Sequence, residues 1–128
     1  MGFLLILITW LLTPLLEIIS LLTVLWVKRK DYSFFKTVSG FFAYAALDRD
    51  RFGNYNYKTA LNFWLSIGGY EFGNALETIS SVLGKKSVEK TLNIAGWFWY
   101  YLLYALDYSN WKKGGHCFAS INNKILIK

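Results

Sequence analysis

The amino-acid sequence predicts an all-α protein, with an N-terminal transmembrane helix followed by about four or five short amphipathic or interfacial helices. Composition is the first indication: of 128 residues, 55% are apolar, 20% aromatic and only 17% charged, whereas about a quarter of an ordinary soluble domain is charged. The second is a nearly continuous apolar run that ends before Lys28, the first basic residue of the chain. The third is the helical spacing of apolar residues in later segments.

The apolar run predicts a membrane anchor at residues 1–30, followed by a small helical, membrane-associated domain at residues 31–128. A helix from residue 3 to residue 27 is about 37 Å long, which exceeds the ~30 Å hydrocarbon core of a bilayer. Tryptophan favours the membrane–water interface, and basic residues end the run abruptly. The residues expected to define the anchor are Phe3, Trp10, Pro14, Glu17, Trp26, Lys28, Arg29 and Lys30.

A cleaved signal peptide is the main alternative for this run. Signal peptides begin with positive charge, have a shorter apolar core and end in a small-residue cleavage site. Here no Lys or Arg precedes the core, the core is longer, and no Ala-x-Ala pattern directly follows it. The sequence therefore favours a retained anchor. The positive-inside rule then places the N-terminus outside and the chain from Lys28 onwards in the cytoplasm or the interior.

Pro14 and Glu17 interrupt the apolar run, and three interpretations are open. Proline has no amide proton and predicts a kink, while a carboxylate near the middle of a bilayer is unfavourable unless it is protonated, paired or hydrated. Glu17 could form a proton-linked site or a polar contact that specifies assembly. It could instead be a neutral carboxyl group bonded to Thr13 or to a neighbouring chain. In the third interpretation the run splits at Pro14, Thr13 caps a second helix, and the two pieces form a membrane-embedded hairpin.

Short helices are expected in the rest of the chain. Residues 33–47 fit an amphipathic helix that ends at the charged residues 48–51 and the turn signal Gly53-Asn54. Residues 57–67 fit a second helix, closed by Gly68-Gly69.

Capping residues then predict the boundaries of three more helices. Asn74 and Glu77 have the spacing of a capping box, and Gly84 is placed to end that helix. Ser87 would begin the next helix, which continues into the aromatic segment at residues 92–106. A last helix is expected at about residues 116–126.

The aromatic segment at residues 92–106 gives a helix of about 22 Å, which is too short for a full span. If it spanned the bilayer, the lysines of the C-terminal tail would lie outside, against the positive-inside rule. An interfacial or buried helix is therefore expected here. Because Trp and Tyr rings combine an apolar body with a polar edge, the predicted interfacial residues are Trp97, Trp99, Tyr100 and Tyr101.

Glu77, His116 and Cys117 are the candidate chemical residues. Cys117 would lie in the first turn of a helix, where the dipole favours the thiolate, but adjacent residues of a helix do not face each other. The chain has one His and one Cys, and metal sites built from one of each are uncommon. The sequence therefore predicts no metal site and no cofactor, and it favours a non-enzymatic role in which Cys117 is a small buried residue.

Between Ala46 and Ile121 the sequence carries a pattern of short motifs: Leu47-Asp48, Gly68-Gly69-Tyr70, ETISS at residues 77–81, and His116-Cys117. In this pattern the chain resembles a family of small, functionally uncharacterised proteins of tailed bacteriophages and prophages. It departs from the pattern at Leu76, where an aspartate usually precedes the Glu-Thr pair, and in having an N-terminal anchor. The resemblance implies a viral origin, so that the membrane would be a host inner membrane or a virion membrane. It also favours a spatial cluster of Glu77, His116 and Cys117.

The function that the sequence favours is that of a small phage-type integral membrane protein with a structural or interaction role in organising a membrane or a virion. Its expected partners are the lipid bilayer, further copies of itself, or other membrane and virion proteins. One alternative is a lysis-type, holin-like membrane protein, and another is a membrane-tethered enzyme that uses Glu77, His116 and Cys117. Nucleic acid is not favoured as a partner because the basic residues form small clusters without a reading helix, and the net charge of +6 fits anionic lipid instead.

Overall fold

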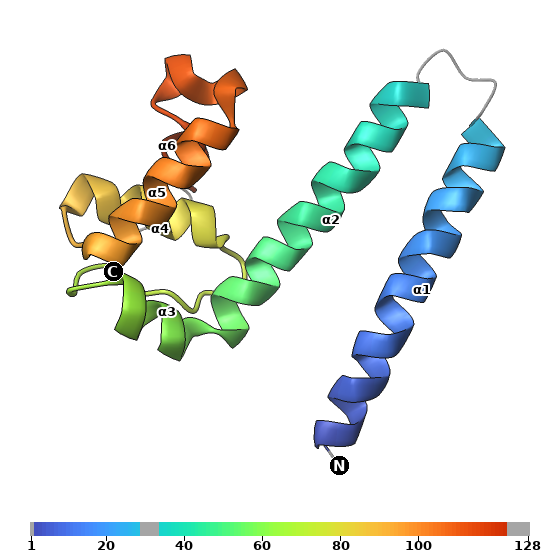
Figure 1. The fold of residues 1–128 in the computed structure, drawn as a ribbon, viewed down its shortest axis with the longest axis horizontal. Helices are drawn as coiled ribbons and strands as arrows, with labels where there is room; N and C mark the ends of the chain where they lie inside the picture. Colours follow the sequence, from blue (N-terminus) through green and yellow to red (C-terminus); the bar gives the residue numbers. More distant parts are fainter. Residues whose placement is uncertain (1, 29–33, 123–128) are drawn as a thin grey trace. The chain divides into compact units, whose positions relative to one another are not determined.

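The computed structural model describes residues 2–28 and 34–122, and in these ranges the chain is all-α, as predicted (Figure 1). The chain divides into two compact units, Met1–Ala46 and Leu47–Lys128, and the boundary falls inside the second helix. The helices are α1 (Gly2–Lys28), α2 (Phe34–Asn56), α3 (Lys58–Leu65), α4 (Ile79–Glu89), α5 (Ile94–Leu106), the 3-10 helix η1 (Tyr108–Lys113) and α6 (His116–Ala119).

Helix α1 is continuous through Pro14, so the alternative of two short helices that meet at this residue is wrong. Nearby hydroxyl groups bond within the helix: Thr9 donates to the carbonyl of Leu5, and Thr13 donates to the carbonyl of Thr9, at 2.9 and 2.7 Å. Such back-bonding satisfies polar side chains where water is absent. From Gly2 to Val27, α1 is long and apolar enough to cross a membrane, and none of its apolar window is buried. The predicted anchor residues Arg29 and Lys30 lie outside the described residues.

Helix α2 is longer than the sequence indicates, since it passes through the charged residues 48–51 and the predicted turn at Gly53-Asn54 and ends at Asn56. The reason is tertiary. Asp50 and Asn54 lie one turn apart on α2. Asp50 accepts from the amide of Ile79, the first residue of α4, and Asn54 donates to the Glu77 carbonyl just before that helix. Gly53 packs against Ile79, and a Cβ atom at this glycine would come within 2.9 Å of the Ile79 side chain. This glycine therefore permits close packing rather than a turn.

The predicted capping box at Asn74 and Glu77 is wrong. The N-cap of α4 is Thr78, whose side chain accepts a hydrogen bond from the Ser81 amide at 3.1 Å. Asn74 instead closes a turn before the helix: its side chain accepts from the Leu76 amide, and its carbonyl accepts from the Glu77 amide. The observed N-cap of α4, Thr78, therefore lies four positions after the predicted one, Asn74.

Helix α4 also continues past its predicted end at Gly84. It ends at Glu89, where Lys90 takes a left-handed conformation with φ of 57°. Gly84 is buried because the backbone carbonyl of Cys117 lies where a Cβ atom would be, which brings α6 close to α4. The glycine is therefore a packing site in mid-helix.

Helix α5 begins at Ile94 and not at the predicted Ser87, because Asn93 caps it by accepting from the Gly96 amide at 2.9 Å. Its 13 residues make a helix of about 20 Å. Helix α6 ends at Ala119, short of the predicted end near residue 126, and residues 123–126 lie outside the described range.

One small hydrophobic core lies where α3, α4, α5 and α6 meet (Figure 1). Among the described residues, the core side chains are Leu65, Phe72, Val82, Leu83, Leu92 and Cys117.

Candidate functional site

The carboxylate of Glu77 is the centre of a buried polar cluster beside this core. It is only 1% exposed. Its Oε1 atom lies 2.7 Å from the Lys85 ammonium and accepts from the Ser81 hydroxyl at 2.6 Å, while Oε2 accepts from the Tyr70 hydroxyl at 2.5 Å. Ser81 and Lys85 lie one and two turns along α4, so this helix supplies two of the three partners.

Burial governs the electrostatics of the Glu77 cluster. The Lys85 ammonium lies 4.2 Å from the centre of the Tyr70 ring, a distance at which a cation and an aromatic face attract each other. Burial raises the pKa of the Tyr70 hydroxyl, and its hydrogen bond to the Glu77 carboxylate adds to this rise. The Ser81 hydroxyl also accepts from the Asn122 amide at 2.9 Å. These groups bond one another inside the protein, so the cluster is built to hold the fold together.

Two asparagine amides connect the loop at residues 66–78 to the helices. The sequence predicted Asn54 only as part of a turn and gave no role to Asn62. Asn54 is fully buried; its amide donates to the carbonyls of Asn74 and Glu77 and accepts from the Gly73 amide. Asn62 of α3 accepts from the Phe72 amide and donates to the Phe72 carbonyl, at 2.9 and 3.0 Å. Asparagine is unfavourable inside a helix, and this is the signal that could have identified both residues.

Lys86 is a second buried cation of α4, and it fixes the other end of the same loop. Its Nζ atom donates to the Ser66 hydroxyl at 2.5 Å and to the Gly68 carbonyl at 2.6 Å. Its side chain is fully buried, and this burial lowers the pKa of the ammonium group.

His116 and Cys117 have partners different from those of Glu77. The His116 Nδ1 atom lies 2.7 Å from a carboxylate oxygen of Asp107. Hydrogen bonds from Ser109, Asn110 and His116 hold the pKa of Asp107 well below its usual range. Burial, together with the negative charge of Asp50, raises the pKa of the Cys117 thiol to about 12.

The Cys117 thiol is therefore protonated at neutral pH, because burial outweighs the dipole of a four-residue helix. Within the described ranges, no three His, Cys, Asp or Glu side chains are grouped to hold a metal ion.

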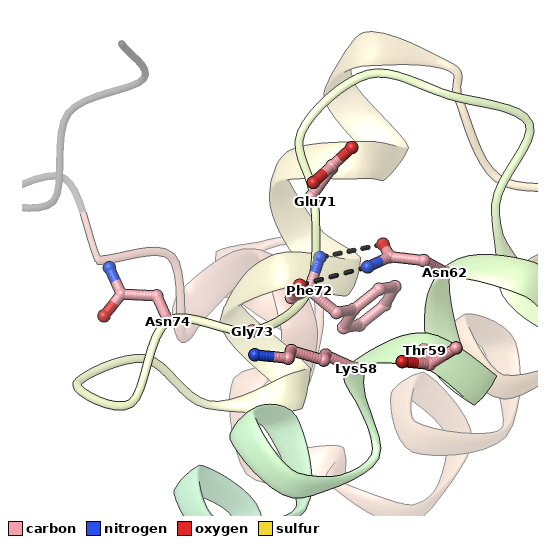
Figure 2. A pocket seen from close by; sticks show the side chains of 7 residues that line it. All are labelled: Lys58, Thr59, Asn62, Glu71, Phe72, Gly73 and Asn74. Atoms are coloured by element: carbon pink, nitrogen blue, oxygen red, sulfur yellow. Dashed lines mark hydrogen bonds between the residues drawn. The ribbon is translucent and has the colours of Figure 1, made fainter.

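A shallow cleft of about 520 Å³ lies between the start of α3 and the loop before α4 (Figure 2). The Asn62 amide faces this cleft, but it is already bonded to the Phe72 backbone, as the dashed lines show. The remaining polar groups of the lining include the Lys58 ammonium and the Glu71 carboxylate. These two exposed, oppositely charged groups do not form a nucleophile–base pair. The cleft is lined by Lys58, Thr59, Asn62, Glu71, Phe72, Gly73 and Asn74.

The four predicted interfacial aromatics of α5 divide between two sides of the helix. Trp97 and Tyr100 pack against the core, whereas Trp99 and Tyr101 are exposed. Large apolar side chains that the sequence reading did not single out are exposed beside them. We call the exposed set the α5 face; it consists of Ile94, Phe98, Trp99, Tyr101 and Leu106.

No protein-family model, no curated protein and no solved structure matches this chain. The resemblance to proteins of tailed bacteriophages therefore stays a prediction.

Proposed function

We propose that this chain is a small integral membrane protein that α1 anchors in the bilayer, with a structural or interaction role in organising a host or virion membrane. One observation carries the proposal: the 26 residues Gly2–Val27 form a single apolar helix with none of its apolar window buried. The core helix of a soluble protein would be mostly covered. Exposing so much hydrocarbon to water is unfavourable by roughly 25 cal/mol per Å².

A retained anchor accounts for this segment better than a cleaved leader. The apolar helix is longer than the 7–15 residues typical of the core of a signal peptide. With all the basic residues on its C-terminal side, we propose that the N-terminus is outside and unit Leu47–Lys128 is on the cytoplasmic or interior side. Fusion of a fluorescent protein to the C-terminus in bacterial cells should give fluorescence, and a C-terminal alkaline phosphatase fusion should stay inactive. The opposite pattern would reverse the orientation.

Glu17 is the residue of α1 through which we propose that copies of the chain associate. It is the one acidic residue of α1, and polar side chains in lipid find hydrogen-bond partners on neighbouring helices. Such a contact contributes about 0.6 kcal/mol on average and at most about 1.7 kcal/mol, which corresponds to a change of roughly threefold to twentyfold in the association constant.

The mass of the full chain in mild detergent tests this role for Glu17. We expect an oligomer whose dissociation constant rises by roughly threefold to twentyfold in Glu17→Leu and is unchanged in Ile18→Val, the matched control on the next residue. An unchanged mass distribution in Glu17→Leu would remove Glu17 from the assembly contact.

A further inference from the structure

We infer that the α5 face is a docking surface for the headgroup region of an anionic lipid bilayer. The inference rests on the proposed function, since α1 is what brings the rest of the chain to a membrane. It adds a second contact with lipid, made by unit Leu47–Lys128 itself, and it assigns that contact to named side chains.

The geometry of α5 separates a packed side from an outward side. At about 100° per residue, the α5 face occupies an arc of roughly 160° on one side of the helix. The opposite side holds Trp97, Tyr100 and Leu103, which pack against the core. Ile94 is 92% exposed and Phe98 is 64% exposed, so the other helices of unit Leu47–Lys128 leave these two side chains open.

The chemistry of the outward side is that of an interfacial helix. From Ile94 to Leu106 there is no charged residue, so both sides of this helix are apolar. Exposed apolar patches of this kind mark interaction surfaces. The polar groups of the α5 face belong to Trp99 and Tyr101, and such rings collect at the level of the lipid headgroups.

The α5 face is held rigidly by α3. The Asn93 amide donates to the Trp64 carbonyl at 2.7 Å, and the Asn93 backbone amide donates to the Leu65 carbonyl at 3.2 Å. Gly96 packs directly on the Leu65 carbonyl. The exposed rings at the end of α3, Phe63 and Trp64, are thereby fixed to the start of the α5 face.

Charge favours lipid over a second copy of the chain. Exposed lysines lie at both ends of α5, Lys90 before it and Lys112-Lys113 after it. In a symmetric pair of α5 helices, parallel or antiparallel, these lysines would meet lysines of the other copy. An anionic bilayer instead attracts them.

Covalent connection to α1 also favours lipid. The chain between Lys28 and Leu47 has 18 residues, 29 to 46, and even a fully extended chain of this length reaches only about 60 Å. The α5 face is therefore confined near any bilayer that holds α1, which raises its effective concentration at that surface.

Spin-label accessibility in the full chain, reconstituted in vesicles that contain anionic phosphatidylglycerol, tests the inference. One nitroxide is attached at a time, in a Cys117→Ala background, to Phe98→Cys on the α5 face, to Val88→Cys on the exposed side of α4, or to Leu15→Cys in α1. We expect oxygen, which concentrates in lipid, to reach positions 98 and 15 several-fold better than a water-soluble nickel complex does. Position 88 should favour the nickel complex.

Each other outcome is decisive. A water-like label at position 98 with a lipid-exposed label at position 15 overturns the inference and leaves the proposed function in place. A label at position 98 that neither reagent reaches, with spin–spin broadening, assigns the α5 face to a second copy, and without broadening it indicates cover by the chain itself; both results overturn the inference. A water-like label at position 15 contradicts the proposed function.

A charge variant tests the role of the lysines separately. With the label at position 98, Lys112→Glu and Lys113→Glu together should move the nitroxide toward water, whereas Lys58→Glu, at the start of α3, should not. If the nitroxide at position 98 lies at the same depth in the double lysine variant, in Lys58→Glu and in the protein without these changes, the lysines do not contribute to the contact with lipid.

Discussion

The buried pair of Glu77 and Lys85 is the residue-scale feature on which the fold of unit Leu47–Lys128 depends most. Both side chains are removed from water, at 1% and 6% exposure. Removing one partner leaves an uncompensated buried charge, so we predict that Glu77→Gln and Lys85→Met each lower the free energy of unfolding by about 3–5 kcal/mol. Denaturant unfolding of the protein in detergent, followed by circular dichroism, measures this.

The double variant Glu77→Leu, Lys85→Met serves as the control for that prediction. Because it removes both charges, it should be more stable than either single variant. Single variants within about 1 kcal/mol of the wild type would contradict the importance of the pair.

Asn54 gives a sharper comparison, because α2 contains a second asparagine with an exposed side chain. Asn54→Ala removes the side-chain partner of the Gly73 amide and of the Asn74 and Glu77 carbonyls, although the Asn74 carbonyl keeps its bond from the Glu77 amide. We predict a loss of about 3 kcal/mol. Asn56→Ala, which breaks one exposed bond within the helix, should change stability by no more than about 0.5 kcal/mol. Equal effects in the two variants would contradict the structural role of Asn54.

Asp107 makes the corner between α5 and α6 sensitive to acid. Its pKa is lower in the folded chain than the ordinary value of 3.8. The stability that it contributes is therefore complete above about pH 4 and is lost as the pH falls toward the lowered pKa. Hydrogen exchange of residues 107–116 should speed up below pH 4 beyond its intrinsic pH dependence, and Asp107→Asn should remove this pH dependence. If acid does not speed up hydrogen exchange of residues 107–116 in the wild type beyond the intrinsic rate, the contribution of Asp107 to stability is contradicted.

At the scale of elements, the contact of α4 with α6 depends on Gly84. A methyl group there meets the Cys117 carbonyl, and we predict that Gly84→Ala destabilises the protein by about 1–3 kcal/mol through overpacking. Because Cys117 is buried behind this contact, its labelling by a thiol reagent, slow in the wild type, should become faster. Gly40→Ala is the control: nothing lies within 4 Å of its added Cβ, so it should stabilise α2 by about 0.5–1 kcal/mol. Unchanged labelling in Gly84→Ala would contradict the proposed packing.

Periodicity predicted the existence of most helices, but several of their boundaries were wrong for one physical reason. Gly53-Asn54 and Gly84 have the local chemistry of turns and helix ends. In the folded chain these glycines lie inside helices because other segments pack on their backbone, and Asn54 lies inside α2 because its amide bonds a distant loop. Tertiary contacts of this kind leave no periodic pattern in a sequence.

In the candidate site too, composition predicted the kind of residue present, whereas the contacts of each side chain depend on the fold. Composition predicted that α5 would be aromatic and too short to span, but only packing decides that Trp97 is inward and Trp99 outward. The sequence predicted that Glu77 takes part in a capping box, which it does not form. The fold instead brings Tyr70 and Lys85 to its carboxylate.

At the scale of the whole molecule, the chain combines one apolar helix without cover and one small unit held together by buried polar groups. The charge asymmetry agrees with this division, since the first 27 residues carry no Lys or Arg and the rest of the chain carries all 14. The lipid bilayer that we propose as the partner would suit both parts, because it would cover the apolar helix and attract the basic remainder.

The state of α1 in cells is the most direct test of the account. Membranes from cells that produce the full chain are washed with alkaline carbonate, and the intact mass of the retained protein is measured. A retained anchor predicts that the protein stays in the membrane pellet with the 14.8 kDa mass of these 128 residues. A protein found in the carbonate supernatant, or a product shortened by the α1 segment, would contradict it.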